Sequence, residues 1–191
     1  ITGGTGSGKT TLLKSIEACG GLILDCDAIY HELLRSDDSM LAAISNRFPG
    51  TVENGTLQRK KLGNIVFSDK SALIDLNKIT HSAIRTAVLH RLAEKPALAA
   101  IDAVALFESG LADLCDVTVA ITAPEEVRIN RLVARDGISR EYAAKRIRAQ
   151  KGGEEFIKRC RYHLENNGTQ EAFREKCLAF LAQQGIIVSE I

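Results

Sequence analysis

The chain is poor in several residue types, and each scarcity excludes a class of protein. It has no tryptophan, one methionine and three prolines, and aromatic residues make up 5% of it. No low-complexity segment and no fixed-period repeat is present, so the sequence indicates neither a disordered region nor a repeat protein. No apolar run approaches the roughly 18 residues of a membrane span, and no signal sequence opens the chain. We therefore expect a cytoplasmic protein with no membrane partner.

The cysteines are also few. Five are scattered over 191 residues, without the C-x-x-C spacing of a zinc site. An odd number of cysteines without a metal-ligand pattern is typical of reduced thiols in a cytosolic protein.

The remaining composition is that of an ordinary globular domain. Hydrophobic residues make up 45% and charged residues 26%, and the net charge is +1. This balance supplies one main core and no global charge that would attract nucleic acid. We expect no nucleic-acid partner, and a monomer is favoured over an oligomer. The chain opens inside ITGG without an initiator Met, so we expect N-terminal residues to be missing and the first strand to be truncated.

Short apolar runs predict buried parallel strands. They lie at residues 21–24, 97–101, 117–121 and 186–188, and the first two are followed by Asp25 and Asp102. Residues 10–19 have helical spacing and are followed by two glycines. Strands alternating with helices predict an α/β fold, with a doubly wound five-stranded parallel sheet that includes the truncated first strand.

Two segments interrupt this alternation. In residues 28–93 strands are hard to find and helical spacing recurs, which predicts a helical acceptor-binding insertion. Residues 128–161 contain eleven Lys/Arg against four acidic residues, a net charge of +7, and we expect them to form a lid. The core of this single domain then consists of residues 1–27, 94–127 and 162–191.

The stretch GGTGSGKT, residues 3–10, matches the phosphate-loop pattern G-x-x-x-x-G-K-[ST] without a gap. Its glycines allow backbone N–H groups to approach phosphates, and the helix that follows adds its positive end. Lys9 is expected to bridge the β and γ phosphates of ATP, and Thr10 to bind Mg²⁺. The expected nucleotide-binding residues are Gly4, Thr5, Gly6, Ser7, Gly8, Lys9, Thr10 and Thr11. The alternative is a plain glycine-rich turn before a helix.

Carboxylates stand at the ends of two expected strands, where α/β proteins bind ligands. Strand alternation would point Asp25 and Asp27 the same way. One of them would then serve Mg²⁺ and the other would accept the proton of the attacking hydroxyl; alternatively, one caps the helix that follows. Asp102 is expected either to support the metal or to cap a turn.

Three arginines of the basic segment share one helix face. Arg128, Arg131 and Arg135 are spaced i, i+3 and i+7. Such a face can close over ATP and stabilise the charge of the transferring phosphoryl group. The alternative is a solvated face that pairs with Glu125 and Glu126.

Further short motifs occur in a fixed order along the chain. They are Thr2–Thr11, Asp25-Cys26-Asp27, Asn54–Leu62, Leu76–Ser82, Val104–Glu108, Arg131–Ser139, Ala149-Gln150 and Leu164–Gly168. This ordered set resembles the dephospho-coenzyme A kinase family. Ser82 and Val104 replace prolines of the family pattern, and Glu165 replaces an aspartate.

This resemblance implies ATP-dependent phosphorylation of the ribose 3′-hydroxyl of dephospho-coenzyme A, the last step of coenzyme A biosynthesis, with Mg²⁺. It assigns catalysis to Asp27, Lys9 and Arg135, and further nucleotide contacts to Arg131 and Asn166. The substrate residues that it implies are Asp25, Arg59, Asn77, His81 and Glu108. Thr10 and Asp102 are expected at the metal. Two alternatives remain: another P-loop kinase of a nucleoside, nucleotide or sugar, and an ATP-binding regulatory protein without activity.

Overall fold

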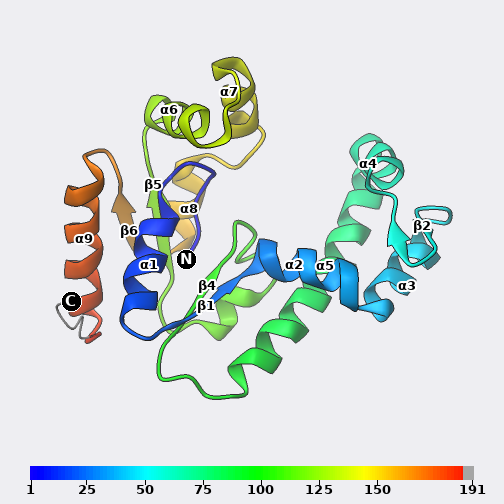
Figure 1. The fold of residues 1–191 in the computed structure, drawn as a ribbon, viewed down its shortest axis with the longest axis horizontal. Coiled ribbons are helices and arrows are strands. Elements are labelled where there is room, and N and C mark those ends of the chain that lie inside the picture. Colours follow the sequence, from blue (N-terminus) through cyan, green and yellow to red (C-terminus); the bar gives the residue numbers. More distant parts are fainter. Residues whose placement is uncertain (187–191) are drawn as a thin grey trace. The chain divides into compact units, whose positions relative to one another are not determined.

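The computed structural model describes residues 1–186 and has an α/β fold with parallel strands (Figure 1). In chain order the elements are α1 (Lys9–Ala18), β1 (Leu22–Asp25), α2 (Cys26–Ser36), α3 (Asp38–Arg47), β2 (Val52–Glu53), β3 (Thr56–Leu57), α4 (Arg59–Ser68), α5 (Lys70–Leu92), β4 (Ala99–Asp102), the 3₁₀ turn η1 (Leu111–Leu114), β5 (Val119–Thr122), α6 (Glu125–Asp136), α7 (Arg140–Arg148), α8 (Gly153–Arg159), β6 (Tyr162–Glu165) and α9 (Gln170–Gln183).

The chain forms two compact units. The first contains residues 1–24, 96–107 and the described chain from 111 onward, and the second contains residues 25–95 and 108–110.

The strands of the first unit pair along short segments. β5 and β6 are parallel, in a register that sets Val119 opposite Tyr162 and Thr122 opposite Glu165. β1 pairs with β4. The residues that begin the chain add hydrogen bonds to two of these strands. Thr2 donates to the carbonyl of Val119 at 3.0 Å, and the carbonyl of Ile1 accepts from the backbone N–H of Ala103, which follows β4, at 3.2 Å.

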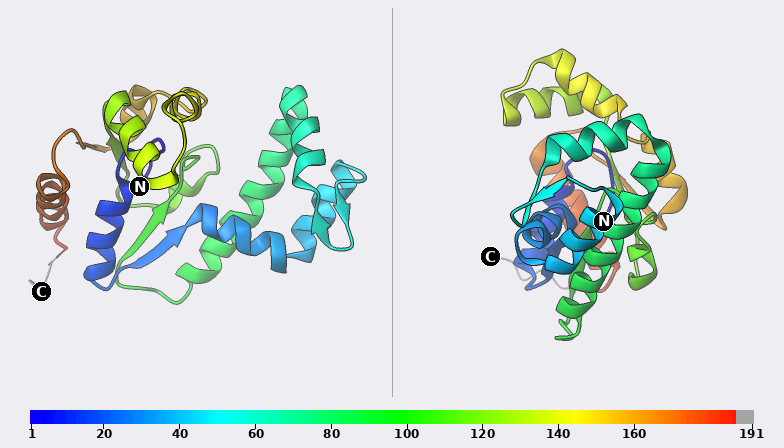
Figure 2. Two further views of the ribbon diagram at one scale, coloured as in Figure 1. Left: turned by 45° about the horizontal axis from the view of Figure 1, so that its top comes forward. Right: turned by 90° about the vertical axis from the view of Figure 1, so that its right-hand side faces the viewer.

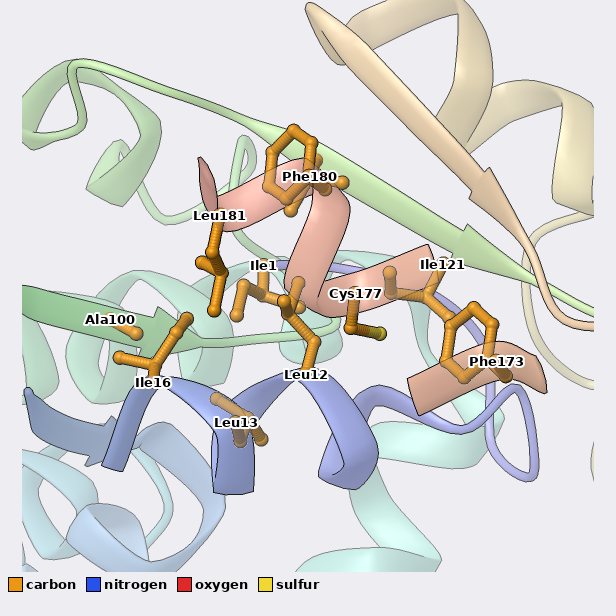
Figure 3. Close-up of a cluster of buried hydrophobic side chains, with 11 residues drawn as sticks. Ile1, Leu12, Leu13, Ile16, Ala100, Ile121, Phe173, Cys177, Phe180 and Leu181 are labelled. Atoms are coloured by element: carbon orange, nitrogen blue, oxygen red, sulfur yellow. The ribbon is translucent and has the colours of Figure 1, made fainter. Parts of the chain in front are cut away.

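Helices α1 and α9 enclose the main core of the first unit (Figure 3). Leu12 and Cys177 are fully buried and Leu181 is nearly so, and Figure 3 shows Leu12 pointing from α1 toward α9. Burying a leucine or phenylalanine side chain is worth roughly 2 kcal/mol. This cluster therefore anchors α1, and with it the loop that precedes α1, to the rest of the unit.

Helices α6 and α7 form a smaller packed pair in the same unit. Ile129 and Leu132 of α6 meet Ala143 and Ile147 of α7 in a separate buried cluster. Helix α6 ends at Asp136, and the C-cap residue Gly137 has a left-handed φ of 65°, as expected of a glycine at a helix end. A short link and this apolar seam hold the two helices together, and their polar faces remain for other contacts.

In the second unit, the long helix α5 is the element against which α2, α3 and α4 pack (Figure 2). The buried side chains between them include Leu34, Ile44, Phe48 and Leu62. The short strands β2 and β3 pair antiparallel, with Val52 opposite Leu57. None of the described helices is long and apolar enough to cross a membrane.

Parallel strands in an α/β fold are confirmed, and the helix expected at 10–19 is α1. Strand β6 was not predicted, and the hairpin of β2 and β3 lies where we expected helices only. Of the strand expected at 186–188, Ile186 is described and is not in a strand, and the other two positions lie outside the described residues.

Candidate active site

The phosphate loop, residues 3–8, runs directly into α1. Gly6 and Gly8 have φ values of 75° and 101°, in the left-handed region that favours glycine. A Cβ on Gly8 would also lie 2.1 Å from the side-chain nitrogen of Asn166. Glycine is required at position 8 for both reasons, the backbone angle and the close approach of a side chain.

The carbonyl groups of the loop are bound by long polar side chains. Arg128 Nε donates to the carbonyl of Thr5 at 2.8 Å, and Arg131 Nη1 donates to the carbonyls of Gly6 at 3.2 Å and Ser7 at 3.3 Å. The carbonyl of Gly3 accepts from Lys9 Nζ at 3.1 Å. Helix α6 thus supplies the donors for three consecutive loop carbonyls.

Holding these carbonyls also fixes the direction of N–H groups. In a trans peptide the C=O of one residue and the N–H of the next point in opposite directions, and no cis peptide occurs in the described chain. Among the described residues, no protein acceptor is found for the N–H groups of Gly6, Gly8, Lys9 and Thr10. A loop whose carbonyls are occupied and whose N–H groups are open, at the start of a helix, is suited to bind an anion.

A lysine and two side chains with oxygen atoms that could bind a metal lie at this loop. Lys9 Nζ is 3.9 Å from Asp102 Oδ1, and both side chains are largely shielded from solvent. Thr10, in the first turn of α1, is exposed. A hydroxyl and a carboxylate are hard oxygen ligands of the kind that Mg²⁺ prefers, with phosphate oxygens and water completing its shell. The residues present therefore fit a magnesium ion held with a polyphosphate.

Asn166 follows β6 and reaches the loop from the far end of the chain. Its side chain is 3% exposed. Asn166 Nδ2 donates to the carbonyl of Ser7 at 2.9 Å, and its Oδ1 accepts from Arg131 Nη2 at 2.8 Å. Both polar groups of Asn166 are therefore engaged with protein atoms at the loop.

The three arginines on the face of α6 have different surroundings. Arg128 is buried, with 8% of its surface exposed, and burial lowers the pKa of Arg128 and of Arg131. Arg135 instead forms two hydrogen bonds with Asp136, at 2.6 and 3.0 Å. These bonds, with a further one from Arg146, lower the pKa of Asp136 to about 2.

The acidic partners expected for that face are bound by other arginines. Glu126 pairs with Arg140, and Glu125 pairs with Arg148 at 3.3 Å. The solvated, ion-paired basic face is therefore made by arginines of α7, whereas Arg128 and Arg131 lie against the phosphate loop.

The expectation that strand alternation extends from Asp25 to Asp27 is wrong. Asp25 ends β1 and is the N-cap of α2, where its Oδ1 accepts from the backbone N–H groups of Asp27 at 2.9 Å and Ala28 at 3.0 Å. Asp27 already lies in the first turn of α2, so the period-2 alternation of a strand does not reach it. Its side chain is exposed.

Residues expected to bind the acceptor are found in the second unit. His81 of α5 is near Glu108: burial lowers the pKa of His81, while a hydrogen bond that His81 donates to the backbone of Glu108 and the charge of the Glu108 carboxylate oppose that shift. Arg59 Nη2 lies 3.3 Å from His31 Nδ1. Asn77 is on α5, four residues before His81, and its carbonyl accepts from Thr80 Oγ1 at 3.3 Å.

Comparison with known proteins identifies the family. Residues 1–172 match the family model described as dephospho-CoA kinase. The chain belongs to the dephospho-CoA kinase family. It is 33% identical over 189 residues to the dephospho-CoA kinase of Syntrophotalea carbinolica, covering 96% of this chain and 90% of that protein. It is 35% identical to that of Geobacter sulfurreducens, covering 92% of each chain.

Two solved structures are similar to the described fold. The crystal structure of TT1252 from Thermus thermophilus has a TM-score of 0.78 at 34% identity and covers 96% of this chain and 95% of that one. The dephospho-CoA kinase from Campylobacter jejuni has a TM-score of 0.67 at 26% identity, covering 98% and 97%. The resemblance predicted from the motifs is confirmed.

The dephospho-CoA kinase motifs distribute over the two units. The first unit contains the loop, Asp102, the arginines of α6 and Asn166, and the second contains Asp27, Arg59, His81 and Glu108.

Sequence reasoning did not single out His31, nor Arg85, which donates to the carbonyl of Gly110 at 2.5 Å. Gln150 was noted only as part of a motif, although its side chain accepts from the N–H of Thr5 at 2.7 Å. These partners are far apart in sequence, so no local spacing signals them.

Proposed function

We propose that this chain transfers the γ-phosphoryl group of ATP to the 3′-hydroxyl of the ribose of dephospho-CoA, giving CoA and ADP, the last step of CoA biosynthesis. Family membership gives the reaction. The observation that carries the donor half is the phosphate loop, in which the N–H groups of Gly6, Gly8, Lys9 and Thr10 have no protein acceptor within the described residues.

In this proposal the loop residues Gly4 to Thr11 cradle the phosphates of ATP. Lys9, beside Asp102 and the carbonyl of Gly3, moves its charge to the β and γ phosphates when ATP binds. Phosphoryl transfer has a loose transition state, so fixed N–H groups and cations contribute mainly by positioning and by charge stabilisation. Arg131 and Asn166 contribute at the nucleotide end of the loop, and Arg135 supplies charge to the transferring group.

Magnesium is part of the proposal. Thr10 and Asp102 are the residues that would hold Mg²⁺, Thr10 by its hydroxyl and Asp102 directly or through water. The ion would neutralise negative charge on the phosphates, which otherwise repels the attacking oxygen.

The acceptor is assigned to the helical residues 28–93. Arg59, Asn77, His81 and Glu108 would bind dephospho-CoA, with Asp25 supporting them from the end of β1. Asp27 would align the 3′-hydroxyl and accept its proton. Its exposed position in the first turn of α2 leaves the carboxylate accessible to a ligand.

The finer architecture is also a proposal. We infer one kinase domain with a core of residues 1–27, 94–127 and 162–191, the acceptor insertion and a lid at 128–161. The hydrogen bonds of Ile1 and Thr2 toward β4 and β5 support a doubly wound five-stranded parallel sheet in which these residues end the truncated first strand. We further propose a cytoplasmic monomer without a nucleic-acid partner.

One assay tests the proposed function. The purified chain is incubated with ATP and Mg²⁺ and with dephospho-CoA, adenosine, a nucleoside monophosphate or a sugar, and ADP and phosphorylated product are separated by chromatography. We expect turnover with dephospho-CoA to exceed that with each other acceptor. Preference for another acceptor would make the chain a different P-loop kinase, and ATP binding without any turnover would make it a regulatory protein.

A further inference from the structure

Thr5 is held through both of its peptide units, Gly4–Thr5 and Thr5–Gly6, by side chains of the basic segment. Arg128 Nε donates to the carbonyl of Thr5 at 2.8 Å, and Gln150 Oε1 accepts from the N–H of Thr5 at 2.7 Å. The two side chains also meet, with Arg128 Nη2 3.4 Å from Gln150 Oε1. Thr5, Arg128 and Gln150 thus form a closed set of contacts, which we call the Thr5 brace.

The side chain of Arg128, a residue of α6, is buried against the phosphate loop. With 8% of its surface exposed, it is the one buried charged side chain among the residues that the structure describes. Burying a guanidinium is costly unless its N–H groups are bound, and here they have the Thr5 carbonyl and Gln150 as acceptors. Glu125, one turn earlier on α6, adds an opposite charge that favours the charged form of Arg128.

The glycines of the loop fit around this arginine. A Cβ on Gly4 would lie 2.3 Å from Arg128 Nη2, and a Cβ on Gly6 would lie 3.0 Å from the carbonyl oxygen of Arg128. Glycine at both positions therefore allows the loop to close around Arg128, in addition to the left-handed φ of 75° at Gly6.

Gln150 is itself fixed where α7 ends. Its backbone N–H donates to the carbonyl of Ile147 at 3.1 Å, and Ile147 is buried in the cluster between α6 and α7. The apolar seam of that helix pair thus places the two side chains that hold Thr5, Arg128 from α6 and Gln150 just after the end of α7.

We propose that Arg128 and Gln150 are positioning residues for phosphoryl transfer. Arg128 holds the Thr5–Gly6 peptide and Gln150 holds the Gly4–Thr5 peptide before it, and together they fix Thr5 so that the N–H of Gly6 faces the phosphates of ATP. This inference rests on the proposed ATP site at the loop. The physical reason is the trans peptide: with the Thr5 carbonyl held by Arg128, the N–H of Gly6 points the opposite way. A donor fixed before ATP binds avoids the cost of reorienting it during the reaction.

The test measures nucleotide affinity and kinetics of the full chain with Arg128→Met and Gln150→Met. We expect the Kd for ADP, measured by calorimetry, and the KM for ATP to rise about tenfold in each variant, while the KM for dephospho-CoA stays within about twofold. Arg140→Met is the matched control, since Arg140 pairs with Glu126 on the surface. The control should bind ADP as the unaltered chain does.

The double variant distinguishes a brace from two separate contacts. If the residues act as one unit, Arg128→Met with Gln150→Met should bind ADP within about twofold of the weaker single variant. Losses that multiply would overturn the proposal, as would unchanged ADP affinity in Gln150→Met. Tighter ADP binding by Gln150→Met would also overturn it, because Gln150 would then compete with phosphate for the Thr5 N–H.

Two further controls keep the test decisive. Should Arg128→Met fail to fold, Arg128→Lys retains the charge and stem but not the planar fork, and we expect its ADP affinity to lie below that of the unaltered chain. ADP binding does not require turnover, so it tests the brace even if the chain does not phosphorylate dephospho-CoA. If dephospho-CoA is not phosphorylated, the proposed acceptor is wrong. The ADP affinities of the variants then still support or contradict the Thr5 brace.

Discussion

The side-chain nitrogen of Asn166 donates a hydrogen bond of 2.9 Å to the carbonyl of Ser7, a residue 159 positions earlier in the chain. This bond joins the segment after β6 to the phosphate loop, and it turns the N–H of Gly8 in the opposite direction. The same nitrogen occupies the space next to Gly8 where a Cβ would be. Position 8 therefore couples the conformation of the loop to the C-terminal part of the first unit.

We predict that Gly8→Ala lowers both stability and ATP binding. The alanine would be held at a φ of 101° and its Cβ would lie 2.1 Å from Asn166 Nδ2. Backbone strain of this kind costs about 1–3 kcal/mol, and displacement of Asn166 adds to it. Thermal unfolding and calorimetric ADP titration measure the two effects. Gly20→Ala is the control, since Gly20 has a φ of 77° but no atom within 4 Å of the added Cβ; equal losses in both variants would mean that the Asn166 contact is unimportant.

Lys9→Ala should abolish phosphoryl transfer and leave the fold intact. The ammonium of Lys9 contacts the carbonyl of Gly3 and approaches Asp102, so its charge serves the loop and not the apolar core. We expect a loss of kcat of at least about 10³-fold, with circular dichroism unchanged. Lys14→Ala, an exposed position of the same helix, should retain full turnover. Comparable turnover by Lys9→Ala and Lys14→Ala would exclude the proposed donor site.

Asp27→Asn should reduce kcat by roughly 10²–10⁴ while the KM for dephospho-CoA changes little. Asparagine retains size and hydrogen bonding but removes the charge that would accept the 3′-hydroxyl proton. Steady-state kinetics with both substrates varied measures the split. Asp38→Asn, at an exposed aspartate in the first turn of α3, controls for losing a negative charge near a helix start. A rate for Asp27→Asn as high as that of Asp38→Asn would contradict the catalytic assignment.

Asp25→Ala should destabilise the second unit by about 1 kcal/mol, the typical value of an N-cap. The carboxylate of Asp25 satisfies two backbone N–H groups at the start of α2, and alanine cannot. Asp25→Asn retains a capping oxygen, so its free energy of unfolding should stay near that of the unaltered chain. Chemical denaturation of both variants measures the difference, and equal stability of the two would mean that the cap contributes nothing.

Asp136→Asn should lower the melting temperature at neutral pH, and this deficit should shrink in acid. Hydrogen bonds from Arg135 and Arg146 lower the pKa of Asp136 from 3.8 to about 2. Because the folded pKa lies below the unfolded one, the stabilisation is present above about pH 4 and is lost as pH falls through 2. The carboxylate is at the surface, so high salt should reduce the deficit as well. Melting curves of both proteins from pH 7 to pH 2 test this; a deficit that is constant with pH would rule out the charge as its cause.

Much of the fold was predictable because its signals are local. The phosphate-loop pattern, helix α1 and the apolar runs that became β1, β4 and β5 each lie within a few consecutive residues. Strand β6 was missed although its side chains alternate between half-buried and exposed, because four residues with a histidine and a glutamate lack an apolar run. The β2–β3 hairpin has two residues in each strand, too few for any period to be read.

The candidate site was predictable only in part, for a physical reason. Residue types such as Lys9 and Thr10 follow from the motif, but their partners come from distant segments. Asp25 shows the limit of periodicity: a helix begins one residue later, and the alternation that we extended to Asp27 ends there. The roles assigned to Asp27, Arg59, His81 and Glu108 stay predictions from the family motifs.

The buried thiol of Cys177 can report how often the helices that cover it in the first unit separate. It is fully buried between α1 and α9, and burial raises its pKa to about 11, so at neutral pH it is almost entirely protonated. A thiol in that state reacts with an alkylating reagent only after the surrounding helices separate and it can ionise in water. The rate at which Cys177 is alkylated therefore measures how often α9 parts from the helix that carries the phosphate loop, and nucleotide that tightens this packing should slow the labelling.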